Sequence, residues 1–165
     1  KMLGSHHQPE QVDVNIHAVL QRVRQLVSAE IDNQVTFIGD YDPSIPELYA
    51  DFDQLVQIFL NIVRNAVQAF EGEGTIILRT RVQRNISIEQ KQHRLGINIQ
   101  IEDNGPGIPP ELQESMFFPL VTGRAEGTGL GLYLVQNLIQ RNNGMISCVS
   151  NVGKTSFSVV FPLEI

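Results

Sequence analysis

The sequence predicts an α/β fold, in the form of a two-layer α+β sandwich with helices on one face of a mixed β-sheet. Apolar residues recur at helical spacing in three segments, 14–29, 51–70 and 128–144, which alternate with strand-like runs. The chain has 165 residues, a length that suits a single domain with its own hydrophobic core. With 42% hydrophobic and 18% charged residues, its composition is that of a globular protein. We therefore expect one sheet covered by three main helices.

The first part of the chain contains a polar start, a helix and a strand. Residues 1–12 are expected to form a flexible start, and 13–165 to form the folded domain. The helix over 14–29 is indicated by an apolar stripe at helical spacing. This stripe comprises Ile16, Val19, Leu20, Val23, Leu26 and Val27. His17 lies at its edge. The alternating residues of 34–41 indicate a strand, which the two prolines that follow interrupt.

The second helix begins after Asp51, a residue type that caps helices. Gln54, three residues later, completes the pattern of a capping box. The apolar stripe of this helix consists of Leu55, Phe59, Ile62, Val63, Ala66 and Phe70. Two asparagines, Asn61 and Asn65, stand one turn apart on its polar side. A polar helix face accounts for their position but not for their type, because asparagine is a mediocre helix former.

The second half of the chain alternates strands with a long irregular segment and a helix. Two strands are expected at 75–82 and 95–103, joined by a hairpin loop over 83–94. Residues 103–132 are rich in glycine and proline, and a long irregular segment inside a domain is usually functional. The third helix is expected to end at Gly144. Two final strands follow, at 145–150 and 155–163.

Charge and cysteine content argue against several classes of function. The formal net charge is −6, from 12 Lys and Arg against 18 Asp and Glu, and without a basic run we expect no binding to nucleic acid. No apolar run is long enough to cross a membrane. The single cysteine, Cys148, is expected to be a small buried apolar residue. It cannot form an internal disulfide, which fits a reducing compartment and a cytoplasmic location.

Three glycine-bearing clusters lie outside the expected helices and strands: "DNGPGI" at 103–108, "GTGLGL" at 127–132 and "GKTSF" at 153–157. Each cluster alone is weak evidence for a functional site, because glycines also occur in ordinary turns and helix caps. A glycine loop that leads into a helix nevertheless suits a phosphate, since the free N–H groups and the helix dipole both favour an anion. The spacing matches neither a Walker loop nor the dinucleotide-binding fingerprint.

Together with "NIVRNA" at 61–66, these clusters have the order of the N, G1 and G2 boxes of one ATP-binding family. "FFP" at 117–119 stands in the place of its F box, and Gly153 and Thr155 in the place of its Gly-x-Thr element. From about Val14 onward, the chain resembles the nucleotide-binding domains of gyrase, Hsp90, histidine kinases and MutL. The resemblance implies a Bergerat-type ATP-binding fold that uses ATP and Mg²⁺.

Longer stretches narrow the resemblance. "DYDPSIPEL", "LNIVRNAVQA" and "EDNGPGIPPELQESMFFPLVTGR" are similar to NtrB (nitrogen regulator II), a family of nitrogen-regulation sensor histidine kinases. This resemblance implies the catalytic domain of a cytoplasmic two-component kinase whose full-length form is a homodimer. It also implies three partners: the protein's own histidine-bearing dimerisation domain, the response regulator NtrC and the PII signal protein.

The resemblance also implies roles for individual residues. Asp103 should accept a hydrogen bond from the adenine amino group, since a carboxylate accepts and cannot donate. Gly105 and Gly107 should let the backbone approach the base. Thr155 should touch the adenine edge, a role that its residue type alone would not indicate. ATP contacts are implied for Asn61, Asn65, Asp103, Gly105, Gly107, Ile108, Arg124, Gly127, Thr128, Gly129, Leu130, Gly131 and Thr155.

The two asparagines of the second helix receive different roles from the resemblance. Asn65 should ligate Mg²⁺ through its amide oxygen, a hard ligand for a hard ion. Asn61 stands where ATP-hydrolysing family members carry a glutamate that activates water, and an amide cannot act as a general base. Arg64 is assigned a catalytic role beside Asn61, as a phosphate contact. Arg124 is either a phosphate contact or a solvated arginine, and Lys154 receives no role.

No histidine lies in the setting of a phosphoacceptor, which is normally near an acidic residue on a helical hairpin. His6 and His7 lie in the polar start, and His17 has no flanking acid. The chain is therefore expected to be the catalytic half of a kinase, following a hairpin that precedes Lys1. Two alternatives stay open: an ATPase of the same superfamily, against which Asn61 argues, and a non-enzymatic module whose bound nucleotide sets a conformation for partner docking.

Overall fold

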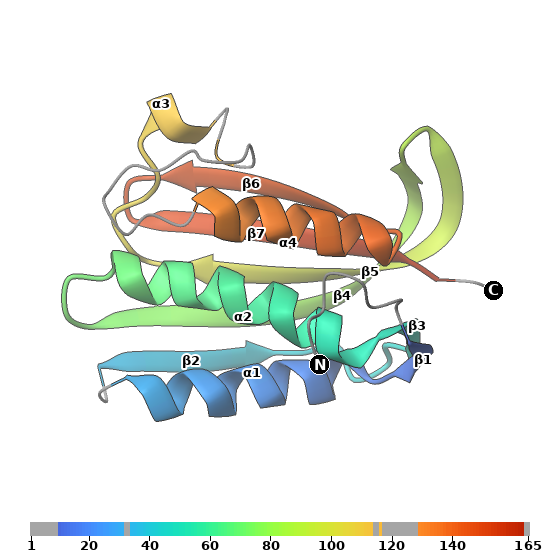
Figure 1. The fold of residues 1–165 in the computed structure, drawn as a ribbon, viewed down its shortest axis with the longest axis horizontal. Helices are drawn as coiled ribbons and strands as arrows, with labels where there is room; N and C mark the ends of the chain where they lie inside the picture. Colours follow the sequence, from blue (N-terminus) through green and yellow to red (C-terminus); the bar gives the residue numbers. More distant parts are fainter. Residues whose placement is uncertain (1–9, 32–33, 114–115, 117–128, 164–165) are drawn as a thin grey trace.

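The computed structural model describes residues 10–31, 34–113, 116 and 129–163. Its main sheet has five strands in the order β2-β4-β5-β7-β6 (Figure 1). The strands are β2 (Val35–Asp40), β4 (Gly74–Ile88), β5 (Lys91–Asp103), β6 (Met145–Asn151) and β7 (Lys154–Pro162). β2 pairs with β4 in parallel and the other pairs are antiparallel, which confirms the predicted mixed sheet.

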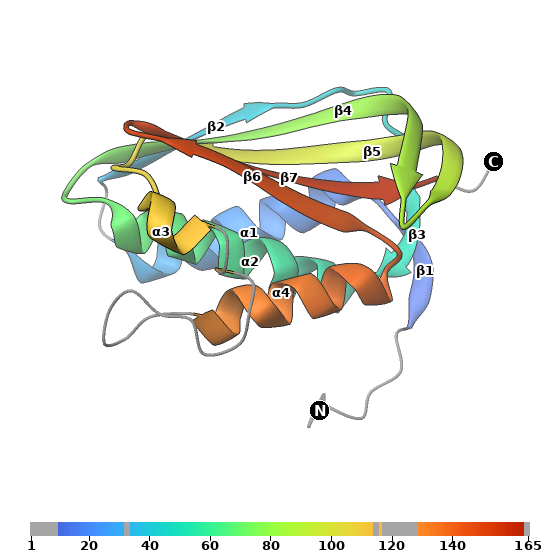
Figure 2. The same cartoon turned by 90° about the horizontal axis from the view of Figure 1, so that it is seen from above.

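Three helices cover one face of this sheet, as Figure 2 shows from above. They are α1 (Ile16–Glu30), α2 (Phe52–Ala69) and α4 (Gly129–Arg141), while α3 (Pro110–Gln113) is a short helix of 4 residues. Alternate residues of β4, β5 and β7 are buried against the helices, and so are most residues of the predicted stripes of α1 and α2. Leu26 and Phe70 are only partly buried, and Phe70 follows the last residue of α2. This arrangement confirms the predicted two-layer sandwich.

The hairpin formed by β4 and β5 is longer than the sequence analysis predicts. Residues 83–94 are not a loop, because both strands continue through them to a two-residue turn at Glu89 and Gln90. Both turn residues have positive φ, 51° and 68°, as a type I′ hairpin turn requires. Ile86 and Ile88 form a small buried cluster with Val160 on β7. Arg84 and Asn85 interrupt the apolar alternation between Val82 and Ile86, and Asn85 has a positive φ of 55°.

A second, two-stranded sheet pairs β1 (Gln11–Val14) with β3 (Leu48–Asp51) in antiparallel register. Neither strand is predicted, since strands of 4 residues have little internal pattern and this pairing joins segments far apart in the chain. Gln11 and Val12 belong to the range 1–12 that is expected to be flexible, and pairing with β3 gives them regular structure. β1 leads into α1 after a single residue, so this small sheet fixes where the first helix begins.

The predicted cap of α2 is present, but its capping box is closed in a different way. The Asp51 carboxylate accepts a hydrogen bond from the Gln54 N–H at 3.0 Å. The Asp51 N–H donates to Asn142 Oδ1 at 3.1 Å, and Gln54 Oε1 accepts from Asn142 Nδ2 at 2.9 Å. Asn142 is 2% exposed and follows the end of α4. It therefore joins the C-terminal end of α4 to the N-terminal end of α2.

The end of α4 also differs from the prediction. The residue in the left-handed conformation is Asn143, with φ of 67°, rather than Gly144. The Gly144 N–H donates to the Ile139 carbonyl at 2.9 Å, which closes the last turn. A Cβ on Gly144 would lie 2.6 Å from the Phe161 ring and 2.7 Å from the Val160 carbonyl oxygen. Close packing onto β7, rather than backbone conformation, therefore requires this glycine.

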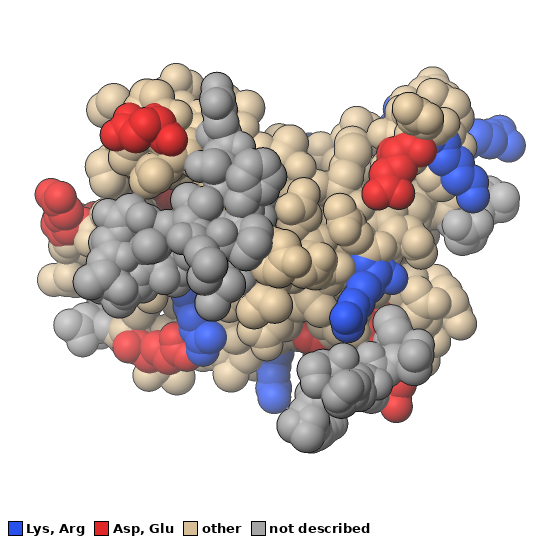
Figure 3. Space-filling view, turned by 45° about the horizontal axis from the view of Figure 1, so that its top comes forward, with Lys and Arg blue, Asp and Glu red and all other residues tan. Residues whose placement is uncertain are grey.

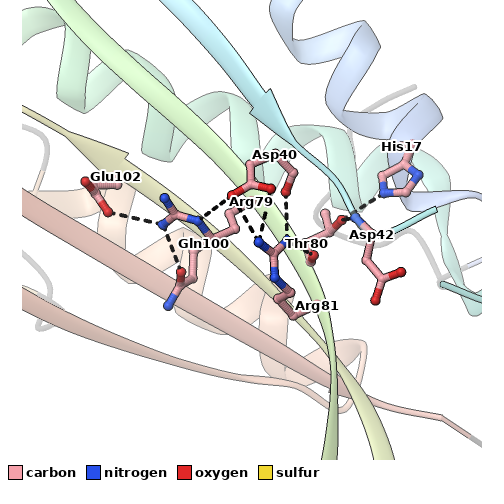
Figure 4. A network of polar contacts seen from close by, with 8 residues as sticks. All are labelled: His17, Asp40, Asp42, Arg79, Thr80, Arg81, Gln100 and Glu102. Carbon is pink, nitrogen blue, oxygen red and sulfur yellow. Dashed lines mark hydrogen bonds and ion pairs between the residues drawn. The ribbon is translucent and has the colours of Figure 1, made fainter. Parts of the chain in front are cut away.

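Charged side chains join β2, β4 and β5 on the face of the sheet that the main helices leave uncovered (Figure 4). Arg79 on β4 donates to Asp40 Oδ2 at 3.1 Å and to Glu102 Oε1 at 3.2 Å. Arg81 donates to both carboxylate oxygens of Asp40 at 3.0 Å. These bonds from Arg79 and Arg81 hold the pKa of Asp40 below its usual value. These side chains are partly exposed, so their ion pairs add little to the free energy of folding. Their main effect is to hold β2 beside β4, the parallel pair of the sheet.

His17, near the start of α1, packs against the other face of β4 (Figure 4). Its Nε2 lies 2.9 Å from Thr80 Oγ1, and its ring stacks on Tyr41 with 4.6 Å between the centroids. Burial lowers the pKa of the imidazole, against a smaller opposing effect of the Asp42 charge. His17 therefore has a structural role between α1 and the sheet.

Charged side chains are dispersed over the face shown in Figure 3, where acidic and basic groups alternate among the described residues. Neither sign gathers in a continuous patch on that face, although the formal net charge of the chain is −6.

Within the described ranges, no helix combines the length and apolar character needed to span a membrane.

Candidate functional site

The segments that the sequence analysis assigns to a nucleotide site lie toward one end of the molecule. In Figure 1 these are the end of β5, the turn between β6 and β7, the C-terminal half of α2 and the start of α4. Figure 2 shows the same segments at the left of the sheet. Four distant parts of the chain are thus brought together at this end of the sandwich.

Asp103 and Thr155 lie opposite each other on neighbouring strands. They are Cα partners in the antiparallel β5–β7 pair, and their exposed fractions are only 7% and 3%. Strand alternation puts both on the face that carries the buried apolar residues, so they form the polar end of an apolar row. Burial raises the pKa of Asp103 above its ordinary value; the Gly105 N–H opposes this shift, and the Glu102 charge adds a smaller increase.

Hydrogen bonds hold the loop that follows Asp103. The Gly105 N–H donates to Asp103 Oδ1 at 2.9 Å, which fixes one oxygen of the carboxylate. Asn104 binds Thr75 twice: its N–H donates to the Thr75 carbonyl at 3.3 Å, and its Oδ1 accepts from the Thr75 N–H at 2.8 Å. Among the described residues, Asp103 Oδ2 has no hydrogen-bond partner, so this oxygen is available to a bound molecule.

The loop meets the turn between β6 and β7 at Gly107. Gly107 has φ of 93°, and a Cβ there would lie 2.5 Å from the carbonyl oxygen of Asn151. An L-residue at this position would be strained and would also push the two segments apart. The structure therefore requires glycine at 107 for its packing against the β6–β7 turn, a contact that the sequence analysis does not predict, and the approach of this backbone to a base stays a prediction.

Ser150, which the sequence analysis does not single out, joins this loop to Thr155. Its Oγ accepts a hydrogen bond from the Ile108 N–H at 2.8 Å and lies 2.6 Å from Thr155 Oγ1. Ser150 and Thr155 are Cα partners in the β6–β7 pair. The only sequence signal for Ser150 is its place on the same face of β6 as Cys148, and that signal has no meaning until the strand pairing is known.

Cys148 lies on this face of β6 and is partly buried, so the prediction of a buried apolar residue holds only in part. Burial, followed by the charge of nearby Asp103, raises the pKa of the thiol to about 12. The thiol therefore stays protonated at neutral pH and behaves as an apolar neighbour of the site.

On α2, Asn61 and Asn65 lie one turn apart and are half-buried. Arg64 is directed toward α1, where its Nε donates to Glu30 Oε1 at 3.1 Å and its Nη2 donates to Glu30 Oε2. These bonds hold the pKa of Glu30 below its usual value. The sequence analysis does not predict this pair. Glu30 engages only Nε and Nη2 of Arg64, so a phosphate contact by Arg64 would either use its other N–H groups or require its release from Glu30.

The first turn of α4 contains Gly129, Leu130 and Gly131, whose backbone the structure describes as helical. Free N–H groups at the start of a helix attract anions, in line with the phosphate contacts predicted there. The remaining predicted residues of this region lie outside the described residues: Arg124, Gly127, Thr128 and the F box at 117–119. Lys154 is exposed at the start of β7.

Among the described residues, no group of three or more His, Cys, Asp and Glu side chains is placed to hold a metal ion. The amide of Asn65 is of the type that Mg²⁺ accepts alongside substrate phosphates.

The described residues at this end of the sandwich have the groups that a purine nucleotide requires: an acceptor carboxylate is turned inward beside a glycine loop, and the first turn of α4 lies at the same end. Residues 50–165 match the family described as histidine kinase-, DNA gyrase B-, and HSP90-like ATPase, and the chain belongs to this family. The match confirms the resemblance inferred from the four boxes.

Comparison with individual proteins shows which members of this family the chain is similar to in sequence. The chain is 49% identical over 165 residues to the sensory histidine kinase/phosphatase NtrB of Escherichia coli O157:H7. It is 40% identical over 166 residues to the protein of the same name from Rhodobacter capsulatus. Each alignment covers 99% of the chain but 47% of the relative, so the chain spans about half the length of the curated relatives it matches.

Solved structures show the same fold. The catalytic domain of the histidine kinase ThkA matches with a TM-score of 0.78 at 24% identity, covering 93% of this chain and 95% of that one. The mycobacterial sensor histidine kinase MprB matches with a TM-score of 0.73 at 22% identity, covering 93% and 97%. At these identities the likeness concerns the fold alone, and it agrees with the predicted Bergerat-type arrangement.

Proposed function

We propose that this chain is the catalytic, ATP-binding domain of a nitrogen-regulation sensor histidine kinase. The observation that carries the proposal is the buried pair of Asp103 and Thr155 on adjacent strands, joined to a glycine loop. Family membership and the names of the relatives support it. Because the chain covers about half of those relatives, the activity and partners of the whole protein belong to the proposal.

Adenine recognition is assigned to the end of β5. Asp103 Oδ1 is engaged by the Gly105 N–H, so Oδ2 is the oxygen that would accept from the adenine amino group. Thr155, beside it, would face the neighbouring ring nitrogen. Gly107 and Ile108 hold the loop against the β6–β7 turn, which keeps this edge of the site in place.

The triphosphate is assigned to the C-terminal half of α2 and the start of α4. The N–H groups of Gly129, Leu130 and Gly131, in the first turn of α4, would donate to phosphate oxygens. Mg²⁺ fits the donor set, because Asn65 offers an amide oxygen and the phosphates would supply further oxygen ligands. When bound, Mg²⁺ would neutralise charge on the phosphates, as phosphoryl transfer requires.

Asn61 favours phosphoryl transfer over hydrolysis. Its amide cannot take a proton from water at neutral pH, so α2 would orient the triphosphate without activating water. The acceptor would be a histidine on the separate dimerisation domain, and the phosphoryl group would then pass to the response regulator NtrC. Control by the PII signal protein, a homodimeric full-length form and a cytoplasmic location complete the proposal.

The test uses the chain with Mg·ATP, alone and with a separate dimeric hairpin that carries the acceptor histidine. The chain alone should not label itself, and the mixture should give acid-labile phosphate on the hairpin. Asn61→Ala should lower the transfer rate more than the ATP affinity. Gln57→Ala, an exposed position one turn earlier on α2, should change neither. Rapid steady ATP hydrolysis without the hairpin would favour an ATPase, and nucleotide binding without any phosphoryl transfer would favour a binding module.

The metal assignment has its own measurement. Asn65→Ala should leave metal-free ATP binding largely intact and remove the gain in affinity that Mg²⁺ gives. Titrations of ATP with and without Mg²⁺ compare the variant with the parent chain. A full magnesium effect in Asn65→Ala would place the metal on other ligands.

A further inference from the structure

Ser150 is placed to decide in which direction the Thr155 hydroxyl donates its hydrogen bond. Ser150 Oγ lies 2.6 Å from Thr155 Oγ1 and 2.8 Å from the Ile108 nitrogen. Ser150 pairs with Thr155 across β6 and β7, and Thr155 pairs with Asp103 across β7 and β5. A row of three polar side chains therefore crosses three adjacent strands at the end of the sheet.

Counting donors and acceptors shows which side chain donates in each hydrogen bond of this row. The Ile108 N–H can only donate, so Ser150 Oγ is the acceptor of that bond. A hydroxyl that accepts one hydrogen bond becomes a stronger donor of its own hydrogen. We propose that Ser150 donates to Thr155 Oγ1, which leaves the Thr155 hydrogen for the bound base. This inference rests on the proposed function, because it places a purine at Asp103 and Thr155.

The result is a donor beside an acceptor. Thr155 donates and the Asp103 carboxylate accepts, so the pair is complementary to adenine, whose C6 amino group donates and whose N1 accepts. Guanine presents the reverse pattern, with an accepting O6 and a donating N1–H. In the opposite arrangement, with Thr155 donating to Ser150, Thr155 would offer only lone pairs to the base. Ser150 is thus a positioning residue that sets the preference for ATP over GTP without touching the base.

The experiment measures the affinities of ATP and GTP by calorimetric titration of the parent chain and of Ser150→Ala. The ratio of ATP affinity to GTP affinity should fall about three- to tenfold in Ser150→Ala, because one discriminating hydrogen bond loses its direction. Ser150→Thr keeps a hydroxyl and should keep the ratio. Ser147→Ala, at an exposed position on the other face of the same strand, should leave both affinities unchanged.

A second measurement separates orientation from simple loss of structure. In a Thr155→Val background, Ser150→Ala should change the ratio no further, since Ser150 acts through Thr155. Equal losses of ATP and GTP affinity in Ser150→Ala would mean that Ser150 only anchors the loop through Ile108, and would overturn the proposal. A parent chain that binds no ATP would contradict the proposed function itself. A parent chain that prefers ATP, with the same preference in Ser150→Ala, would refute the role of Ser150 alone.

Discussion

Replacing Asp103 with asparagine should weaken ATP binding strongly without lowering the stability of the fold. Asparagine has the shape of aspartate, but one of its two terminal atoms is a donor. The Gly105 N–H, 2.9 Å from Asp103 Oδ1, decides where that donor points. The asparagine oxygen would keep this bond, so the NH₂ group would take the place of Oδ2, opposite the amino group of adenine.

The size of the effect follows from this arrangement. A hydrogen bond to a charged acceptor contributes about 1.5–3 kcal/mol. Its loss corresponds to a Kd for ATP that is weaker by roughly 10- to 150-fold. Two donors that face each other add a further cost, so we expect a value in the upper half of that range.

Stability should respond in the opposite direction or not at all. Burial raises the pKa of Asp103 in the folded chain, so the ionised form is less favourable there than in the unfolded chain. For a carboxyl group with a raised folded pKa, stability is highest below the unfolded pKa and decreases as pH rises through the folded pKa. A neutral asparagine removes that loss, so the thermal midpoint at neutral pH should stay equal or rise.

The assay pairs calorimetric titration of ATP with thermal unfolding. The ATP affinity of the parent chain should also decrease as pH is lowered toward the raised pKa of Asp103, relative to Asp103→Asn at the same pH values. Subtracting the variant corrects for protonation of ATP itself. Unchanged ATP affinity in Asp103→Asn would refute the contact between Asp103 and adenine. A large fall in the thermal midpoint would show instead that affinity is lost through the fold.

Two further substitutions test the packing around the site. Gly107→Ala would place a Cβ 2.5 Å from the Asn151 carbonyl oxygen at a φ of 93°, so it should destabilise the chain and weaken ATP binding. Gly72→Ala, with φ of 108° and no described atom within 4 Å of the added Cβ, should cost only the backbone strain of roughly 1–2 kcal/mol. Equal free energies of unfolding for the two variants would contradict the argument from the Gly107 contact. Asn142→Ala removes the partner of the buried Asp51 N–H and should lower the free energy of unfolding in urea by about 2–3 kcal/mol, whereas Ser147→Ala should leave it unchanged. Equal urea midpoints for the Asn142 variant and the parent chain would exclude this role.

The main helices could be predicted because each carries its own period. The stripe of α1 from Ile16 to Val27 and that of α2 from Leu55 to Ala66 are buried as their spacing predicts. The cap at Asp51 is equally local, since its partner is the N–H three residues later. These features depend on neighbours in the sequence and on the existence of a core, but not on the identity of distant segments.

Features that join distant segments could not be predicted in this way. Asn142 completes the cap of α2 from the end of α4, and Glu30 of α1 binds Arg64 of α2. Both contacts follow from how the helices pack, and no local pattern indicates them. The strands β1 and β3 have no local signal for the same reason, since each is paired with a distant segment.

The residues of the candidate site also differ in whether a local sequence motif indicates them. Asp103, Gly107 and Thr155 lie in motifs whose spacing indicates a nucleotide site, and the structure brings them together. Their part in ATP binding stays a prediction. Ser150 carries no motif, because serine is common on strands and becomes informative only when β6 pairs with β7 in this register.

The pairing of Asp103 with Thr155 makes the site sensitive to the number of residues in β5 and β7. Successive residues of a strand point to opposite faces, so a shift by one residue turns a side chain from the helix layer to solvent. An insertion of one residue near Asp103 would therefore turn its carboxylate away from Thr155. Added residues at Glu89 and Gln90, the exposed far end of the same hairpin, would leave the pairing of Asp103 intact. Tolerance to changes in chain length should thus differ sharply between the two ends of a single strand.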